Sequence, residues 1–444
     1  MIAVAGLALL LAAMPPVSAE PDTAPAAGDS TLHRYLQTLS DSTDRYFGPV
    51  AAGADTAGLD SARAYALVHG DRWPHHARNK LTLLPWVSFN RVDGPVLGAA
   101  AWYGRAQGRG ELRGSIGTAT GPNLMLGRLA YTKQIGPADF YWRLRIAGGR
   151  ETVTMDRERT NRAIAALAGF FAGEDHNHYL RRDGMDFSVS HEGVAHGVTL
   201  AYRDMLESPR SVTATWNLFG HDIAVADNIP AQQGRAREIS LDAELRVPRT
   251  PVYVQALGAA SGAKIGSDFG YRRTRIAAGA DLGITRWLSF VPQAEYGALN
   301  RDALPQESFY LGGNPTLRSL PSGSLGGTRL ALARGELVLT RDLFALLGSQ
   351  RRSSMPVLAS VFGGTGAAWG HDPFGGPDRP GGDWPDDSEW RSEVGTSLLY
   401  QPGVPEPTDF LRISIAWPVG AHSGGSRVSV AFGRAMDLLR PFER

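Results

Sequence analysis

Residues 309–328 read Phe-Tyr-Leu-Gly-Gly-Asn-Pro-Thr-Leu-Arg-Ser-Leu-Pro-Ser-Gly-Ser-Leu-Gly-Gly-Thr. This stretch places one arginine, Arg318, inside a glycine-rich connection. The segments before and after it alternate apolar and polar residues, which is the pattern of half-buried β-strands. An ordinary glycine-rich hairpin loop would have a similar composition. The pattern in the rest of the chain is therefore needed to distinguish a functional loop from an ordinary hairpin connection.

Alternation with a period of two continues through most of the chain after residue 95. It is clearest in four segments, 140–146, 211–218, 238–247 and 410–417. A soluble sandwich also alternates, but its strands are shorter. We count about sixteen such segments, an even number as in bacterial membrane barrels. The first begins near residue 95, the seventh near 210, and 297–326 joins the eleventh to the twelfth. The predicted fold class is all-β, an antiparallel transmembrane β-barrel with a short N-terminal helical arm.

The arginine-bearing stretch resembles the lumen loop of the bacterial surface antigen superfamily of outer-membrane barrels, the BamA and two-partner secretion transporter type. The matching residues are Phe309, Leu311, Gly312, Gly313, Leu317, Arg318, Gly326, Gly327 and Glu336. Ser319 and Leu320 depart from the glycine and aromatic residue that usually follow the arginine. The resemblance implies a barrel of the same strand number, in the outer membrane, that assembles or translocates proteins. It also implies that this loop closes the lumen.

The resemblance further implies that Arg318 pairs with an acidic group of the inner wall, commonly an aspartate in the thirteenth strand. The matching stretch is 362–366, where Gly364 stands in place of that aspartate. Glu336 in the next strand is the first candidate for a replacement partner, and Glu295 is the second. A carboxylate and a guanidinium in a partly dry lumen form a charge-assisted pair. Alternatively, Arg318 binds only backbone carbonyl groups.

The domain organisation follows from composition and pattern. Residues 1–19 resemble a signal peptide, with an apolar run that ends before Val17-Ser18-Ala19. Residues 20–84 form a periplasmic arm that is partly helical at 31–47. This arm is too short for the POTRA domains of most of the superfamily, so the chain resembles a short form without them. The barrel is expected over 85–434, with a tail at 435–444.

The last predicted strand resembles the barrel-recognition signal of outer-membrane proteins. Its residues are Gly425, Val428, Val430 and Phe432. Loop lengths test the topology, because outer loops of such barrels are longer than periplasmic turns. Residues 219–234 and 370–390 are long and fall outside, as expected. Residues 150–183 are long but fall in the periplasm, which requires either a helical insertion or a miscounted strand.

Composition and the remaining polar clusters narrow the function. The chain has 444 residues, no Cys and a net charge of +1, which gives no electrostatic reason to expect nucleic acid and excludes thiolate metal sites. His176 and His178 lack a spaced third ligand. Ser211 and Ser240 lack the partners that a hydrolase needs. We therefore predict no enzymatic activity, no cofactor and no metal.

The partners expected are outer-membrane lipid and a client polypeptide or a periplasmic protein. The leading hypothesis is a protein-assembly or translocation barrel whose lumen is closed by residues 309–328. The alternative is a passive outer-membrane channel or a structural surface protein without translocation activity. A hydrolase at the lumen or rim is a third hypothesis.

Overall fold

The computed structural model describes residues 80–104, 110–137, 140–155, 169–170, 175–193, 195–220, 227–247, 250–300, 304–314, 316–339, 341–346, 357–375, 384–400, 409–420 and 424–434. All of them belong to one compact unit, Arg72–Arg444. The predicted signal peptide, the helix at 31–47 and the tail at 435–444 lie outside the described residues.

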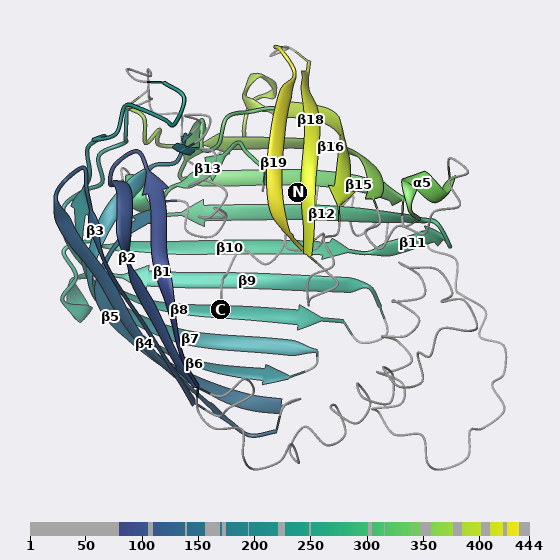
Figure 1. Cartoon of the computed structure of the whole chain (residues 1–444). Helices are drawn as coiled ribbons and strands as arrows, with labels where there is room; N and C mark the ends of the chain where they lie inside the picture. The colour runs from purple at the N-terminus through teal and green to yellow at the C-terminus, as the bar shows by residue number, and fades with distance from the viewer. Residues whose placement is uncertain are drawn as a thin grey trace, which may run out of the picture. The chain divides into compact units, whose positions relative to one another are not determined.

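The described part of the chain is almost entirely β-structure (Figure 1). The strands are β1 (Lys80–Asn90), β2 (Gly94–Gly104), β3 (Gly110–Ala119), β4 (Leu124–Ile135), β5 (Phe140–Thr154), β6 (Tyr179–Gly193), β7 (His196–Pro209), β8 (Gly234–Arg246), β9 (Val252–Ser261), β10 (Tyr271–Ala280), β11 (Leu282–Thr285), β12 (Leu288–Leu299), β13 (Phe309–Leu311), β14 (Leu325–Gly327), β15 (Arg329–Leu339), β16 (Val357–Trp369), β17 (Arg391–Tyr400), β18 (Asp409–Val419) and β19 (Arg427–Arg434). The helices are η2 (Ala263–Ile265), η3 (Pro305–Glu307), α5 (Leu343–Leu346) and η4 (Asp387–Glu389). Within the described ranges, none of the helices is long and apolar enough to cross a membrane.

One antiparallel sheet of 17 strands contains every described strand except β13 and β14, which pair with each other. Neighbours in the chain are neighbours in the sheet, from the β1–β2 pair to the β18–β19 pair. The 17 strands make sixteen passes, because only Asp281 separates β10 from β11 and both pair with β12. The predicted all-β, roughly sixteen-stranded architecture is confirmed. The connection that holds Arg318 joins the eleventh pass to the twelfth, as predicted.

Two strand predictions were wrong, and their errors cancel in the count. The first strand is β1, which precedes the segment near residue 95, and 211–218 does not form a strand of the sheet. Thr213 and Ala214 instead donate their backbone N–H groups to the carbonyl oxygen of Arg91, at 2.9 and 3.0 Å. Alternation reports only that successive side chains face opposite sides. It does not say whether the backbone bonds to a strand or to a turn.

The added strand resolves the anomaly in loop length. In an antiparallel succession, alternate connections lie at the same end of the sheet. With β1 counted, the four longest connections share one end, hereafter the long-connection end; they are 155–178, 210–233, 300–328 and 370–390. The residues at 150–183 were assigned to the wrong end because a strand before them had been missed. The connections at the opposite end, hereafter the short-connection end, are all shorter than these four, and the longest of them is 340–356.

The two faces of the sheet have the reverse of the usual distribution of polarity. On β17, Val394 and Leu398 are 49% and 47% exposed, whereas Glu393 and Ser397 are each 3% exposed. β18 repeats the pattern, with exposed Ile413, Ile415 and Trp417 and buried Arg412 and Ser414. A water-soluble protein rarely presents so large a contiguous apolar surface. Outward apolar residues that alternate with inward polar residues are the arrangement of a lipid-facing barrel.

The exposed apolar face predicts a depth-dependent cost for charge. Val394→Arg, near the middle of β17, should lower the free energy of unfolding in bilayers by about 2–4 kcal/mol, because a guanidinium would enter hydrocarbon. Leu218→Arg is the matched control, because Leu218 is 51% exposed in a connection outside the sheet and should change stability by less than about 0.5 kcal/mol. Reversible urea unfolding in lipid vesicles would measure both. Equal effects of the two substitutions would contradict a lipid-facing role for β17.

Candidate functional site

The connection between β12 and β15 folds into a compact segment, residues 304–328, hereafter the inner segment. It contains η3 and the small β13–β14 hairpin. Two glycines allow the chain to reverse after β13, with φ of 120° at Gly312 and 89° at Gly313. A Cβ atom on Gly312 would lie 2.0 Å from the carbonyl oxygen of Pro321. Only glycine permits this close approach, which explains the Gly-Gly pair quoted above.

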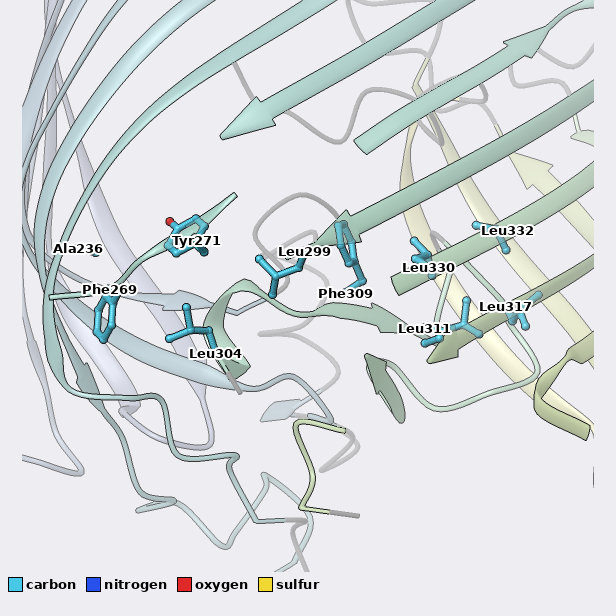
Figure 2. Packing of buried hydrophobic residues seen from close by; sticks show 11 residues of the cluster. Ala236, Phe269, Tyr271, Leu299, Leu304, Phe309, Leu311, Leu317, Leu330 and Leu332 are labelled. Atoms are coloured by element: carbon cyan, nitrogen blue, oxygen red, sulfur yellow. The ribbon is translucent and has the colours of Figure 1, made fainter. Parts of the chain in front are cut away.

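Apolar packing holds the inner segment against the polar-inward face of the sheet (Figure 2). Leu311 and Leu317 are fully buried and pack in one cluster with Leu330 and Leu332 of β15. The same cluster includes Leu304 and Phe309 of the inner segment and reaches β10 and β12 through Tyr271 and Leu299. Burial of a leucine side chain contributes roughly 1.5–3 kcal/mol. This cluster therefore fixes the position of the segment before any polar contact is considered.

Arg318 lies at the centre of the contacts with β15, β16 and β17. Its guanidinium donates to Oε2 of Glu336 at 2.9 Å and to Oγ of Ser397 at 3.1 Å. It also stacks on Phe362, with the guanidinium carbon 3.9 Å from the ring centroid. The side chains of Arg318 and Glu336 are 3% and 7% exposed. The pair is therefore screened from water, where charge-assisted bonds are strongest.

Glu336 serves a second arginine as well. Arg412 of β18 lies 3.2 Å from the same carboxylate oxygen, and Ser360 of β16 donates to the other oxygen at 2.5 Å. Glu295, the second candidate partner of Arg318, lies on β12 and is held instead by Arg275 at 2.8 and 2.9 Å. The structure thus brings together Arg318 and Glu336 and keeps Glu295 in a separate pair.

The glycine at position 364 has a steric reason. A Cβ atom on Gly364 would lie 2.9 Å from Cγ of Arg334 and 3.4 Å from Leu317. Arg334 occupies that space in order to donate to the carbonyl oxygen of Thr316 in the inner segment at 3.1 Å. In this chain the wall carboxylate that pairs with Arg318 is Glu336, in the twelfth pass.

A further acid, Glu393 of β17, binds the backbone beside Arg318. Its carboxylate accepts the N–H of Ser319 at 2.6 Å and is buried. The sequence analysis did not single out Glu393 or Arg412. Both are charged residues on the inward side of alternating strands, which was the available signal. Alternation alone does not show which inward charges meet the inner segment and which meet water.

The opposite side of the inner segment contacts the connections at the long-connection end. Tyr310 packs in a buried cluster with Met155, Leu180 and Ile229. Gln306 exchanges hydrogen bonds with the backbone of Gln232, at 3.1 and 3.2 Å. The inner segment thus contacts both the β15–β18 part of the sheet and the connections that follow β5 and β7.

Two titratable groups at these contacts have shifted pKa values. Burial, with the nearby Glu238 as a second cause, raises the pKa of Glu307 to about 8. Burial, with Arg91 and His176 as further causes, lowers the pKa of His178 to about 3. Nδ1 of His178 accepts the N–H of Ile229 at 3.2 Å. The neutral imidazole, with its proton on Nε2, is therefore the form that this contact requires.

The last strand also contacts the inner segment. Asn314 donates to the carbonyl oxygen of Val430 at 3.0 Å and accepts from Oγ of Ser429 at 3.1 Å. Val428 and Val430 are exposed on the apolar face of β19. Phe432 lies in β19 opposite Leu411, and Gly425 precedes the strand. Their predicted role as a recognition signal remains a prediction.

Asp175, which precedes His176 and His178 in the chain, is engaged in hydrogen bonds. Asp175 accepts the N–H of Arg91 at 3.0 Å and the hydroxyl of Tyr179 at 2.9 Å. Within the ranges that the structure describes, no group of three or more His, Cys, Asp or Glu could hold a metal ion. The predictions of no metal, no cofactor and no enzymatic activity remain predictions.

Comparison with known proteins places the fold. No family model and no curated protein matches the chain. BamA from Haemophilus ducreyi lacking POTRA domains 1–3 is similar in structure, with a TM-score of 0.50 and 14% identity over 80% of this chain and 70% of that chain. CdiB from Escherichia coli gives a TM-score of 0.43 at 11% identity, over 95% and 92% of the two chains. CdiB from Acinetobacter baumannii gives 0.39 at 8% identity, over 80% and 59%. The fold assignment rests on the first of these similarities: the chain has the fold of the BamA-type bacterial outer-membrane barrel.

The shared carboxylate predicts strong coupling between the inner segment and the sheet. Glu336→Gln should destabilise the protein by about 3–5 kcal/mol, because it leaves two buried guanidinium groups without their anion. Adding Arg318→Met should restore part of that loss, so the two changes should be non-additive. Urea unfolding of the single and double variants would measure the coupling. Glu295→Gln is the control and should be additive with Arg318→Met; additivity of Glu336→Gln would refute the coupling.

His178 predicts a loss of stability in acid. Its pKa is about 3 in the folded protein against an ordinary 6.5, so only the unfolded chain takes up a proton between these values. The stabilising contribution is complete above about pH 6.5 and is lost as the pH falls toward 3. His178→Asn keeps an acceptor near Nδ1 but does not titrate, and should flatten this part of the profile. Unfolding measured across this pH range tests it, with His191→Asn as the control; an unchanged slope in His178→Asn would contradict the assignment.

Proposed function

We propose that this chain is a non-enzymatic outer-membrane barrel of the protein-assembly or translocation type, with its lumen closed by the inner segment. The BamA-like fold and the apolar outward face support the membrane assignment. The observation that carries closure is the buried contact of Arg318 with Glu336, on a segment that also packs against the connections after β5 and β7. A segment that is anchored to the sheet on one side and to these connections on the other would block the lumen.

The Arg318 contact also supports a segment that can be released as a unit. Its polar anchors are Glu336 of β15 and Ser397 and Glu393 of β17. Glu336 also binds Arg412 of β18. Loss of the Glu336 carboxylate would weaken several of these contacts together, because two arginines share it. We propose that a client polypeptide or a periplasmic partner acts on this set of contacts.

A passive channel is the second candidate, and one observation favours it. The inward faces of β4 to β6 have a ladder of arginines paired with acids, which includes Arg143–Glu192, Arg145–Asp186 and Arg128–Asp186. These side chains are between 14% and 33% exposed. A partly solvated, charge-paired wall is what a water-filled passage has. Paired charges of both signs would give such a passage little ion selectivity.

Conductance in planar bilayers separates the two candidates. Residues 304–327 can be replaced by a short Gly-Ser linker, because Ala298 at the end of β12 pairs with Arg329 at the start of β15. We expect the wild-type protein to conduct weakly and the replaced variant to form a large, poorly selective pore. A wild-type pore that conducts as well as the variant would refute closure.

A second arm tests translocation. A strain that lacks the gene would receive either the wild-type protein or Arg318→Met, and its surface and secreted proteins would be compared. Loss of particular proteins in the Arg318→Met strain, with the barrel still inserted, supports the proposal. If the set of proteins is unchanged and the wild-type protein conducts, the passive channel is the supported function.

A further inference from the structure

Two arginines from different connections stack on one tryptophan at the short-connection end. The guanidinium carbon of Arg286 lies 4.3 Å from the centroid of the Trp287 ring, and that of Arg341 lies 5.2 Å from it. Arg286 and Trp287 form the turn between β11 and β12, whereas Arg341 follows β15. Leu288 pairs with Leu339, so the sheet register brings the two connections together.

Exposed apolar side chains surround this group. Trp287 is 39% exposed, and Ile284 of β11 is 56% exposed. Phe344 and Leu346 of α5 are exposed as well, and α5 lies at the same end of the sheet as β11 (Figure 1). Tryptophan is enriched where a membrane protein crosses from hydrocarbon to headgroups. The arginine pair therefore lies at the level where hydrocarbon gives way to polar headgroups.

The acid next to Arg341 in the chain is engaged with backbone groups. Asp342, next to Arg341 in the chain, accepts the backbone N–H groups of Phe344 at 3.3 Å and Val357 at 3.1 Å. Its carboxylate is thus engaged in holding α5 and the start of β16. The two guanidinium groups therefore share one aromatic platform. Stacking limits the freedom of each guanidinium and prepares its planar face of donors for an anion.

We propose that Arg286, Arg341 and Trp287 form a binding site for the phosphate of an anionic phospholipid, in the leaflet at the short-connection end. Guanidinium groups bind phosphate oxygens with two parallel hydrogen bonds, and the exposed Ile284, Phe344 and Leu346 face the acyl chains of the same lipid. The site lies outside the inner segment and does not depend on closure of the lumen. It rests only on the proposed membrane placement.

Native mass spectrometry of the full chain, released from bilayers of phosphatidylcholine with a minor fraction of phosphatidylglycerol, tests the site. The wild-type protein should retain phosphatidylglycerol in preference to phosphatidylcholine. Arg286→Gln and Arg341→Gln should each weaken this preference roughly fivefold, the effect of one basic residue near an anionic surface. The matched control is Arg113→Gln with Arg246→Gln, because both arginines are exposed and each lies near an acid of its own strand.

The outcomes are distinct. A preference that is lost in the Arg286→Gln/Arg341→Gln double variant and kept in the control double variant supports the site. Equal retention in the wild type and the double variant overturns it. Displacement of the lipid by inorganic phosphate would show an anion site without lipid recognition and also overturns the proposal. Trp287→Phe keeps an aromatic platform and should retain most of the preference, and failure of the wild type to insert would count against the membrane placement itself.

Discussion

One buried carboxylate, Glu336, lies between two buried arginines, and the packing of the rest of the interior depends on it. Arg318 comes from the inner segment, whereas Arg412 comes from β18. A buried charge without a partner costs several kcal/mol, so neither arginine can be accommodated unless the other elements are in place. The carboxylate therefore couples the position of the inner segment to the packing of β15, β16 and β18, and it links residues that are far apart in the chain.

This coupling divides the inward face of the sheet into two regions with different physical character. From β15 to β18 the polar residues are buried under the inner segment, and their charges are few and shared. From β4 to β6 the charged residues are numerous, paired with one another and partly exposed. Pairs that water can reach contribute about 0–1 kcal/mol each, so the second region stabilises little and remains adaptable. The region under the inner segment therefore contributes most to stability, whereas the partly exposed region can line a polar passage.

Some features of the site were accessible from pattern and others were not. The glycine pair after β13 predicted a tight reversal, and the resemblance, with Gly364 where it implies an acid, predicted Glu336 as the partner of Arg318. The stretch at 211–218 shows where pattern reasoning fails. Its alternation is real, yet Thr213 and Ala214 bond to the β1–β2 turn, because a backbone N–H is satisfied by any well-placed carbonyl. Arg412 and Glu393 were equally visible as inward charges, but nothing local distinguishes them from the arginines of the partly exposed region.

The sequence by itself determined the all-β architecture, the approximate number of passes and the passes that the arginine-bearing connection joins. These properties follow from the two-residue period of a strand and from the composition of turns, which are local. Only the tertiary structure decided that the connection at 150–183 leaves by the long-connection end, that Glu295 belongs to Arg275, and that Asn314 contacts β19. Each of these depends on which distant elements come within a few ångströms, because the energy of a buried charge or hydrogen bond is set by its neighbours in space.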